Sequence, residues 1–157
     1  MLRISKLTDY GTVVLARLAA ARGAIVSAAD VAQATGIALP TVSKILKSLA
    51  RAGLVMSTRG ANGGYALARA PQEISAADVI DALEGPVSIT ECSAAGSQCE
   101  HEGLCSVGGT WQRINVAIRQ ALDEVTLVDL AQANRPLPSF RFAGVAVSVE
   151  TQRPKKA

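Results

Sequence analysis

Three observations along the 157 residues predict a mainly α-helical fold. Apolar residues recur at helical spacing through the N-terminal third of the chain. Two strand-like runs, 54–58 and 65–68, flank a glycine-rich turn. A long helical pattern then follows a segment that holds all three cysteines. Helix, short helix, glycine turn, helix and hairpin is the order of a winged helix-turn-helix, so we expect that fold, with a β-hairpin wing, a cysteine loop and a long helix.

Two helices are expected near the N-terminus. Apolar residues three and four positions apart predict the first over about 8–22, capped by Ser5 or Thr8. Ser27 has the side chain of an N-cap and opens the second helix. Gly36 ends it, because glycine adopts a left-handed backbone at little cost.

The third helix, over about 40–52, is the candidate DNA-reading element. Its apolar stripe comprises Val42, Ile45, Leu46 and Leu49. A rotation of about 100° per residue places three cations on the opposite side, Lys44, Lys47 and Arg51. Thr41 and Ser43 flank its early turns, which approach base edges in the major groove in this motif. An ordinary surface helix would share this pattern, but the turn glycine, the hairpin and the local charge together favour DNA binding.

The hairpin supplies the wing. Its turn, 59–64, is rich in glycine and begins with Arg59. A guanidinium on a narrow loop can enter a minor groove, where the negative potential is strongest. We therefore expect Arg59 to contact DNA beside the third helix.

The rest of the chain predicts shorter elements around one long helix. Ser75 caps a short helix that ends at Gly85, and Thr126 caps one further turn. The long helix, over about 110–125, has an apolar stripe of Trp111, Ile114, Ile118, Leu122 and Val125. The helical pattern dissolves after about residue 133. The expected organisation is a winged helix-turn-helix domain at 1–85, a cysteine loop at 86–108, a long helix at 109–133 and a flexible tail at 134–157.

Charge is segregated along the chain. Residues 1–70 carry nine Lys and Arg against two acids, residues 71–130 carry two against ten, and residues 131–157 carry five against one. The net charges are therefore +7, −8 and +4. A basic front suits a polyanion such as DNA, although a solvated imbalance would give the same totals. Neither a transmembrane run nor a signal peptide is evident, so we expect a cytoplasmic protein with reduced thiols.

Cys92, Cys99 and Cys105 lie in a small, polar segment where burial is not expected. Three thiolates completed by a fourth ligand predict a metal or iron–sulfur site. Zinc is the competing metal, since His101 would complete a Cys₃His set, although the spacing lacks a close zinc knuckle. A thiol switch is also open, but the neighbouring glutamates disfavour free thiolates and favour a bound cation.

These motifs resemble those of the winged-helix iron–sulfur transcriptional regulators of the IscR and NsrR type. The likeness rests on the opening residues 1–11, on Ala32 and Gly36, on the wing at 59–65 and on the cysteine loop. The opening is most similar to the regulators of the Suf cluster-assembly operon. The resemblance implies a homodimer joined through the long helix. It also implies a 2Fe-2S or 4Fe-4S cluster whose state controls operator binding, and repression of iron–sulfur assembly genes. Nitric-oxide or redox sensing is the alternative within the family.

The resemblance leaves the fourth ligand open. Some relatives use a histidine three residues past the third cysteine, where this chain has Gly108. Others use an aspartate from the first helix of the partner subunit, and Asp9 occupies that position here. His101 is a local alternative, and a non-protein ligand is another.

An enzyme is not expected. A nucleophilic cysteine needs a base, and His101 is the only histidine. The glycines of the wing lead into a strand rather than a helix, so they do not form a phosphate-binding loop. A protein-interaction module on a winged-helix scaffold remains the other class to consider.

Overall fold

The computed structural model describes residues 4–60, 62–90, 107–132, 140–142 and 145–147. Its elements are α1 (Lys6–Ala20), α2 (Ala28–Thr35), α3 (Leu39–Arg51), β1 (Val55–Thr58), β2 (Gly64–Leu67), η1 (Pro71–Glu73), α4 (Ala76–Glu84), α5 (Gly108–Asp123), α6 (Leu127–Ala131), β3 (Phe140–Phe142) and β4 (Val145–Val147). The predicted fold class, mainly helical with an antiparallel hairpin, is confirmed. None of the helices in these ranges is long and apolar enough to cross a membrane.

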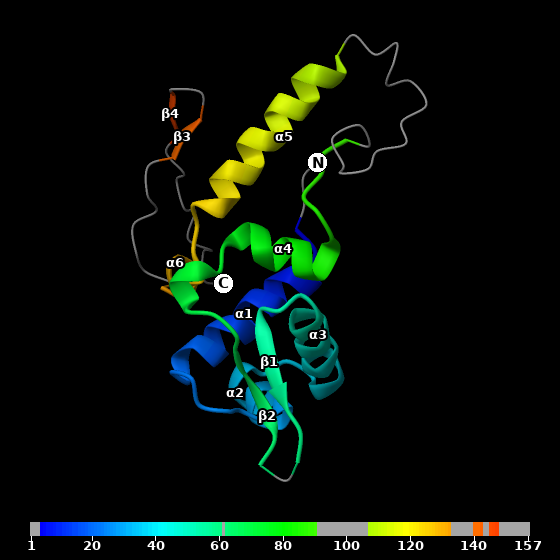
Figure 1. Ribbon diagram of the computed structural model, residues 1–157, viewed down its shortest axis with the longest axis vertical. Coiled ribbons are helices and arrows are strands. Elements are labelled where there is room, and N and C mark those ends of the chain that lie inside the picture. Colours follow the sequence, from blue (N-terminus) through cyan, green and yellow to red (C-terminus); the bar gives the residue numbers. More distant parts are fainter. Residues whose placement is uncertain (1–3, 61, 91–106, 133–139, 143–144, 148–157) are drawn as a thin grey trace, which may run out of the picture.

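Helices α1 to α4 and the β1–β2 hairpin form one body, from which α5 extends away (Figure 1). The core of this body draws fully buried side chains from α1, α2, α3 and α4, and also from α6. Leu127 of α6 is 0% exposed, and α6 packs against α1. The chain therefore returns to the N-terminal body after α5 and closes its core.

Side-chain caps set the helix starts. Ser5, Ser27, Ser75 and Thr126 each accept a hydrogen bond from a backbone N–H in the first turn of the helix that follows. All four are in the predicted positions, since local sequence determines a cap. Thr8, the alternative cap for α1, is wrong in that role: it is 3% exposed inside the first turns of the helix.

The wing is joined to the body by a third backbone segment. Val26 pairs with Tyr65 through two hydrogen bonds, 2.9 Å from the Val26 N–H and 2.8 Å from the Tyr65 N–H. Gly64 lies beside this pairing, and a Cβ there would be 2.6 Å from the Val26 carbonyl oxygen. Glycine is therefore required at position 64 by the close approach of two backbones.

Replacing Gly64 with alanine is expected to destabilise the fold by about 2–3 kcal/mol, because backbone rather than a flexible side chain must move. Urea unfolding of the two proteins measures this loss. Gly109→Ala is the matched control, since a Cβ at Gly109 has no atom within 4 Å. Equal unfolding midpoints for Gly64→Ala and Gly109→Ala would contradict the proposed constraint.

A carboxylate from α4 completes the start of α1. Glu84 accepts a hydrogen bond from the Thr8 hydroxyl and another, of 3.0 Å, from the Ser5 backbone N–H. The Thr8 hydrogen bond, followed by that of Ser5, lowers the pKa of Glu84 below its usual range. These bonds link the start of α1 to the end of α4 across 79 and 76 positions of sequence.

A lowered carboxyl pKa stabilises the fold above the unfolded-state value and loses that effect as the pH falls through the folded value. Glu84→Gln should therefore reduce the free energy of unfolding at neutral pH by about 0.5–1 kcal/mol, and the difference should be lost as the pH falls through the lowered pKa of Glu84. Thermal unfolding across this pH range tests the effect. Glu124→Gln is the control at neutral pH: this carboxylate has no hydrogen-bond partner in the described ranges, so its replacement should leave the free energy of unfolding unchanged.

The predicted apolar stripe of α5 is exposed at its N-terminal end, where Trp111 is 42% exposed, although α5 also contacts α4. Within the range 134–157, expected to be a flexible tail, the described residues Phe140–Phe142 and Val145–Val147 form the antiparallel β3–β4 hairpin. The cysteine-bearing residues 91–106 lie outside the described part of the chain.

Candidate nucleic-acid interface

Helix α3 is held against the body by four side chains. Val42, Ile45, Leu46 and Leu49 are each 0% exposed and belong to the common core. Gly36, with φ of 70°, makes the left-handed turn that leads from α2 towards α3. The orientation of α3 is therefore fixed from beneath, and its opposite side faces outward.

The outward side of α3 carries the predicted cations. Lys44, Lys47 and Arg51 are all exposed. None of the three has an ion-pair partner within the described ranges. Thr41 and Ser43 are partly exposed on either flank of the early turns. The structure thus brings these five residues together on one helix as a surface suited to a polyanion.

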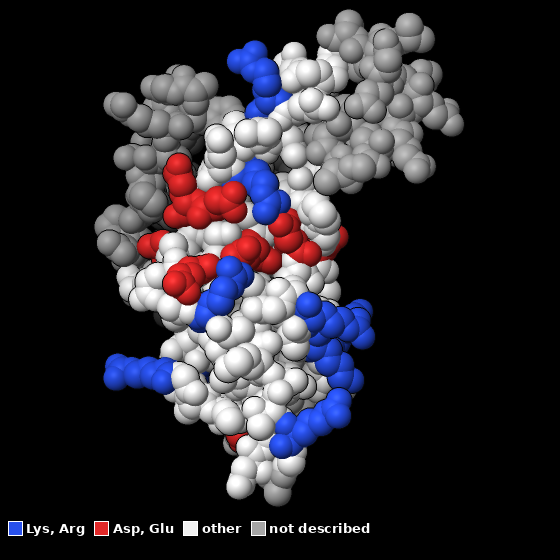
Figure 2. All heavy atoms as spheres, viewed as in Figure 1, with Lys and Arg blue, Asp and Glu red and all other residues white. Residues whose placement is uncertain are grey.

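Arg59 begins the turn of the wing and is exposed. Gly60 follows it with φ of 112°, a conformation that side chains rarely adopt, so the turn depends on glycine. Figure 2 shows Lys and Arg side chains gathered along the edge of the molecule where Figure 1 places α3, and an acidic band over α4 and the lower part of α5. The charge segregation of the sequence is therefore also a segregation in space.

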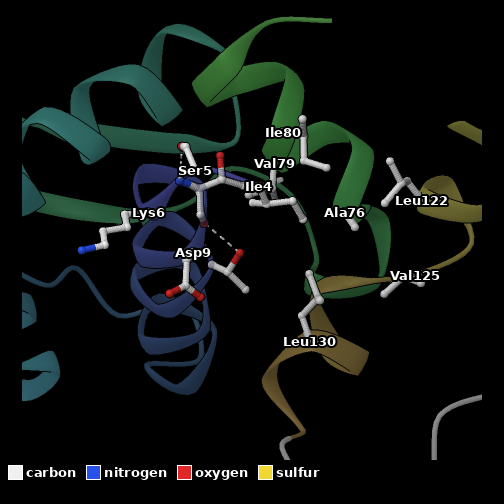
Figure 3. A pocket seen from close by; sticks show the side chains of 12 residues that line it. Ile4, Ser5, Lys6, Asp9, Ala76, Val79, Ile80, Leu122, Val125 and Leu130 are labelled. Atoms are coloured by element: carbon white, nitrogen blue, oxygen red, sulfur yellow. Dashed lines mark hydrogen bonds between the residues drawn. The ribbon is translucent and has the colours of Figure 1, made fainter. Parts of the chain in front are cut away.

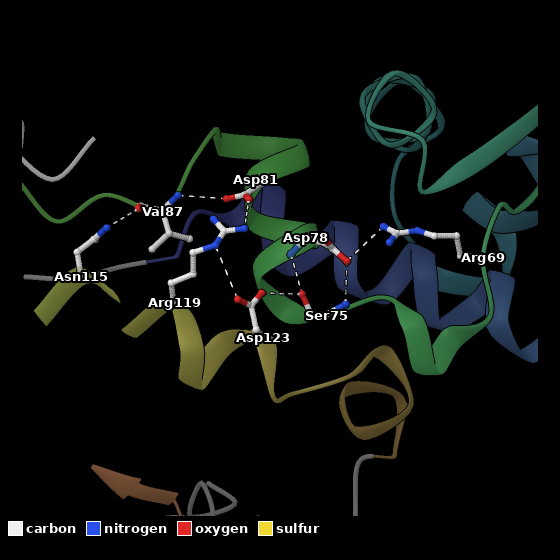
Figure 4. Close-up of polar contacts among 8 residues, drawn as sticks. All are labelled: Arg69, Ser75, Asp78, Asp81, Val87, Asn115, Arg119 and Asp123. Atoms are coloured by element: carbon white, nitrogen blue, oxygen red, sulfur yellow. Dashed lines mark hydrogen bonds and ion pairs between the residues drawn. The ribbon is translucent and has the colours of Figure 1, made fainter. Parts of the chain in front are cut away.

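The cations of the acidic band are already paired. Arg69 lies 3.2 Å from Asp78, and Arg119 lies 2.8 Å from Asp81 and 3.8 Å from Asp123 (Figure 4). The hydrogen bond with Asp81 raises the pKa of Arg119 above its usual range. These arginines join α4 to its neighbours and are not part of the candidate DNA-binding face.

Asn115 is a site residue that sequence reasoning missed. It is 9% exposed on α5, where its side-chain amide donates to the Val87 carbonyl at 3.1 Å (Figure 4). The same side chain accepts a hydrogen bond of 3.3 Å from the Ile89 N–H. Val87 also donates its N–H to Asp81 at 3.1 Å. The segment that leads into the cysteine-bearing residues is therefore tied to both α4 and α5. A polar residue beside the apolar stripe of α5 was the available sequence signal.

Asp9 is exposed near the start of α1, and its carboxylate has no hydrogen-bond or ion-pair partner among the described residues. It lies at one side of a cavity of about 540 Å³ between α1, α4, the end of α5 and α6. Figure 3 shows Asp9 and Lys6 on the α1 side and the apolar side chains of Val79, Ile80 and Leu122 opposite. The carboxylate is thus available to a ligand that approaches α1 from outside.

The other predicted ligands are not placed by the structure. Cys92, Cys99, Cys105 and His101 lie outside the described residues. Within the described ranges, no cluster of three His, Cys, Asp or Glu side chains could hold a metal ion. Gly108 is the first residue of α5 and has no side chain to offer.

A family model named Rrf2 and described as an iron-dependent transcriptional regulator matches residues 4–133. The chain belongs to the Rrf2 family. The predicted resemblance to IscR-like winged-helix regulators is confirmed by this match.

Similar Rrf2 proteins agree in sequence and in structure. The HTH-type transcriptional regulator CymR of Bacillus subtilis is 35% identical over 131 residues, which cover 83% of this chain and 90% of CymR. The solved structure of CymR, described as the global cysteine regulator of B. subtilis, has a TM-score of 0.64 at 34% identity and covers 86% of this chain and 100% of its own. IscR of T. potens has a TM-score of 0.61 at 30% identity, with 85% and 89% covered. This Rrf2 member is therefore a DNA-binding transcriptional regulator and not an enzyme.

Proposed function

We propose that this chain is an iron–sulfur cluster-dependent repressor of iron–sulfur cluster assembly genes, acting in the cytoplasm as a homodimer joined through α5. One observation carries the proposal: the chain combines the exposed cations of α3, which have no ion-pair partner in the described ranges, with three cysteines that the sequence places directly before α5. The family description, an iron-dependent regulator, supports the same cofactor chemistry.

Cys92, Cys99 and Cys105 would hold the cluster. The fourth ligand would be Asp9 of the partner subunit, with His101 as the alternative. The donor set fits the group, because thiolates are the ordinary ligands of iron–sulfur clusters and the Asp9 carboxylate has no competing partner among the described residues. The bound cluster would make the protein sensitive to redox state and to iron. Three thiolates would hold the cluster, and the weaker fourth ligand could be displaced.

The described residues supply a route from that site to the reading face. Asn115 holds the segment at 87–89 against α5, and Arg119 joins α5 to Asp81 of α4. One turn further along, at its C-terminal end, α4 reaches the start of α1 through Glu84. A change in the cysteine segment would therefore alter α5 and α4 together. A coupling free energy of about 1–3 kcal/mol would change operator occupancy roughly 5–150-fold.

The test is an oxygen-free purification followed by an absorption spectrum, iron and sulfide counts, and a mobility-shift titration with the promoter region of the protein's own gene. We expect visible iron–sulfur absorption and a different affinity for DNA after the cluster is removed by chelation. A colourless protein after reconstitution, with unchanged DNA binding, would contradict cluster control.

A thiol-based cysteine or redox regulator is the second candidate, favoured by the 35% identity to CymR, whose solved structure is described as that of a cysteine regulator. Zinc bound by the three cysteines and His101 is the remaining alternative for the cofactor. The metal and sulfide counts separate the three cases, because zinc gives no sulfide and a thiol regulator gives neither metal nor sulfide.

A further inference from the structure

The outward row of α3 starts with an apolar residue. Pro40, Lys44, Lys47 and Arg51 follow one another at intervals of four, three and four residues, so they lie along one line of the helix. This line is opposite the buried stripe of α3. Pro40 is exposed at its N-terminal end, and Leu39, beside it in the first turn, is 46% exposed.

The first turns of α3 lack the side chains that usually read bases. Positions 38–43 are Ala, Leu, Pro, Thr, Val and Ser, and Val42 is buried in the core. Bidentate readout of adenine uses Asn or Gln, that of guanine uses Arg or Lys, and cytosine is read by Glu or Asp. None of these residue types occurs at positions 38–43, before Lys44. This segment can present to a base edge only the hydroxyls of Thr41 and Ser43 and the exposed apolar side chains of Leu39 and Pro40.

In the major groove, thymine alone carries an apolar group on its edge, the C5-methyl. A hydrocarbon surface at the reading end of a helix can therefore discriminate bases by burying that methyl. The cations that follow along the same line supply the attraction to phosphate, which carries no sequence information of its own.

We propose that Leu39 and Pro40 read the operator through thymine C5-methyl groups, so that the first turn of α3 selects thymine by apolar contact while Lys44, Lys47 and Arg51 position the helix. This inference rests on the proposed DNA-reading role of α3. The occupant of the exposed apolar turn is the major groove of duplex DNA, as the adjoining row of unpaired cations indicates.

A purely structural role would explain only part of the pattern. Pro40 in the first turn favours helix initiation, because its missing N–H would have no helical partner there. That role does not require an exposed leucine beside it. The N-cap of α3, Ala38, makes no side-chain hydrogen bond, so helix capping does not explain why Leu39 is exposed.

The experiment removes the methyl from the DNA rather than an atom from the protein. Duplexes are selected from a randomised pool with the full chain, in whichever of the cluster-bound and cluster-free states binds DNA. Each thymine of the selected site is then replaced singly by uracil, which lacks only the methyl. We expect one or two thymines per half-site at which uracil weakens binding about fourfold, the value for burial of one methyl-sized group.

Protein variants identify the partner of each methyl. In Leu39→Ala or Pro40→Ala, the thymine duplex should bind about fourfold more weakly for each half-site, and the uracil substitution should cause no further loss at the contacted position. Lys47→Ala is the matched control, because it should weaken the thymine and uracil duplexes equally. Both apolar positions are exposed, and a thermal unfolding curve confirms that each variant is folded.

Three outcomes would overturn the inference. The first is a selected site at which no uracil substitution matters. The second is a uracil penalty that persists unchanged in both Leu39→Ala and Pro40→Ala, since it would then arise from DNA shape or another residue. The third, failure to bind any duplex in either state, would overturn the proposed DNA-reading role itself and is therefore distinguishable from the other two.

Discussion

Replacing Lys44, Lys47 and Arg51 together with alanine is expected to weaken duplex binding about a hundredfold for each half-site near 0.15 M salt. Three lost phosphate contacts on each subunit remove about 2.7 per half-site from the log–log slope of affinity against salt. All three side chains are exposed and unpaired in the described ranges, so their loss should leave the fold intact. Mobility-shift or fluorescence titrations at four or more salt concentrations, roughly 50–300 mM, would measure both quantities.

Arg113→Ala is the matched control for this prediction. Arg113 is an exposed cation on α5, away from α3 in the fold, so its removal changes the net charge without touching the reading face. We expect a small change in affinity and an unaltered salt slope. If the triple variant kept the wild-type slope, the phosphate contacts would have to be assigned to other side chains.

Alanine at Cys92, Cys99 or Cys105 is expected to abolish the visible iron–sulfur absorption and to leave less than half of the iron bound after reconstitution, because two thiolates and one weak ligand hold a cluster poorly. Absorption spectra and iron counts of anaerobically prepared variants provide the measurement. Full retention of the spectrum in one variant would remove that cysteine from the ligand set.

The same preparations decide the fourth ligand. Asp9→Asn should reduce cluster retention about 10–100-fold if the partner's Asp9 ligates iron, whereas His101→Ala should then behave as wild type. The reverse result would assign the position to His101. Asp9 is exposed and makes no side-chain hydrogen bond within the described ranges, so a folding defect is not expected from its replacement.

Local features of the fold were predictable because neighbouring residues determine them. A cap needs a hydroxyl and the N–H groups of the next turn, and Ser27, Ser75 and Thr126 satisfy this condition within three residues of sequence. The same holds for the left-handed Gly36 and for the buried stripe of α3. The candidate DNA-binding residues follow from that stripe, since the exposed side of a helix is fixed once its buried side is known.

Features that depend on distant partners were not predictable. Val26 pairs with Tyr65 as an isolated β-bridge. A single residue is too short to show the alternation of apolar and polar residues that predicts a strand. The bond from Glu84 to the start of α1 depends on how α4 crosses α1, where Gly11 faces Leu83 with no room for a Cβ. Asn115 is a functional candidate only because the chain at 87–89 returns to α5. Such contacts follow from tertiary packing, which no window of sequence contains.

Leu127 makes the N-terminal body dependent on a segment that comes after α5. Two backbone hydrogen bonds of 2.8 Å join this segment to residues 74–76: the Leu127 N–H donates to Ile74, and the Ala76 N–H donates to Val125. A fragment ending at Gly85 would lose both bonds and leave a hole where Leu127 is packed. Transfer of the N-terminal DNA-binding body to another regulator would therefore also require residues 125–131. The exchangeable folding unit is thus discontinuous in sequence.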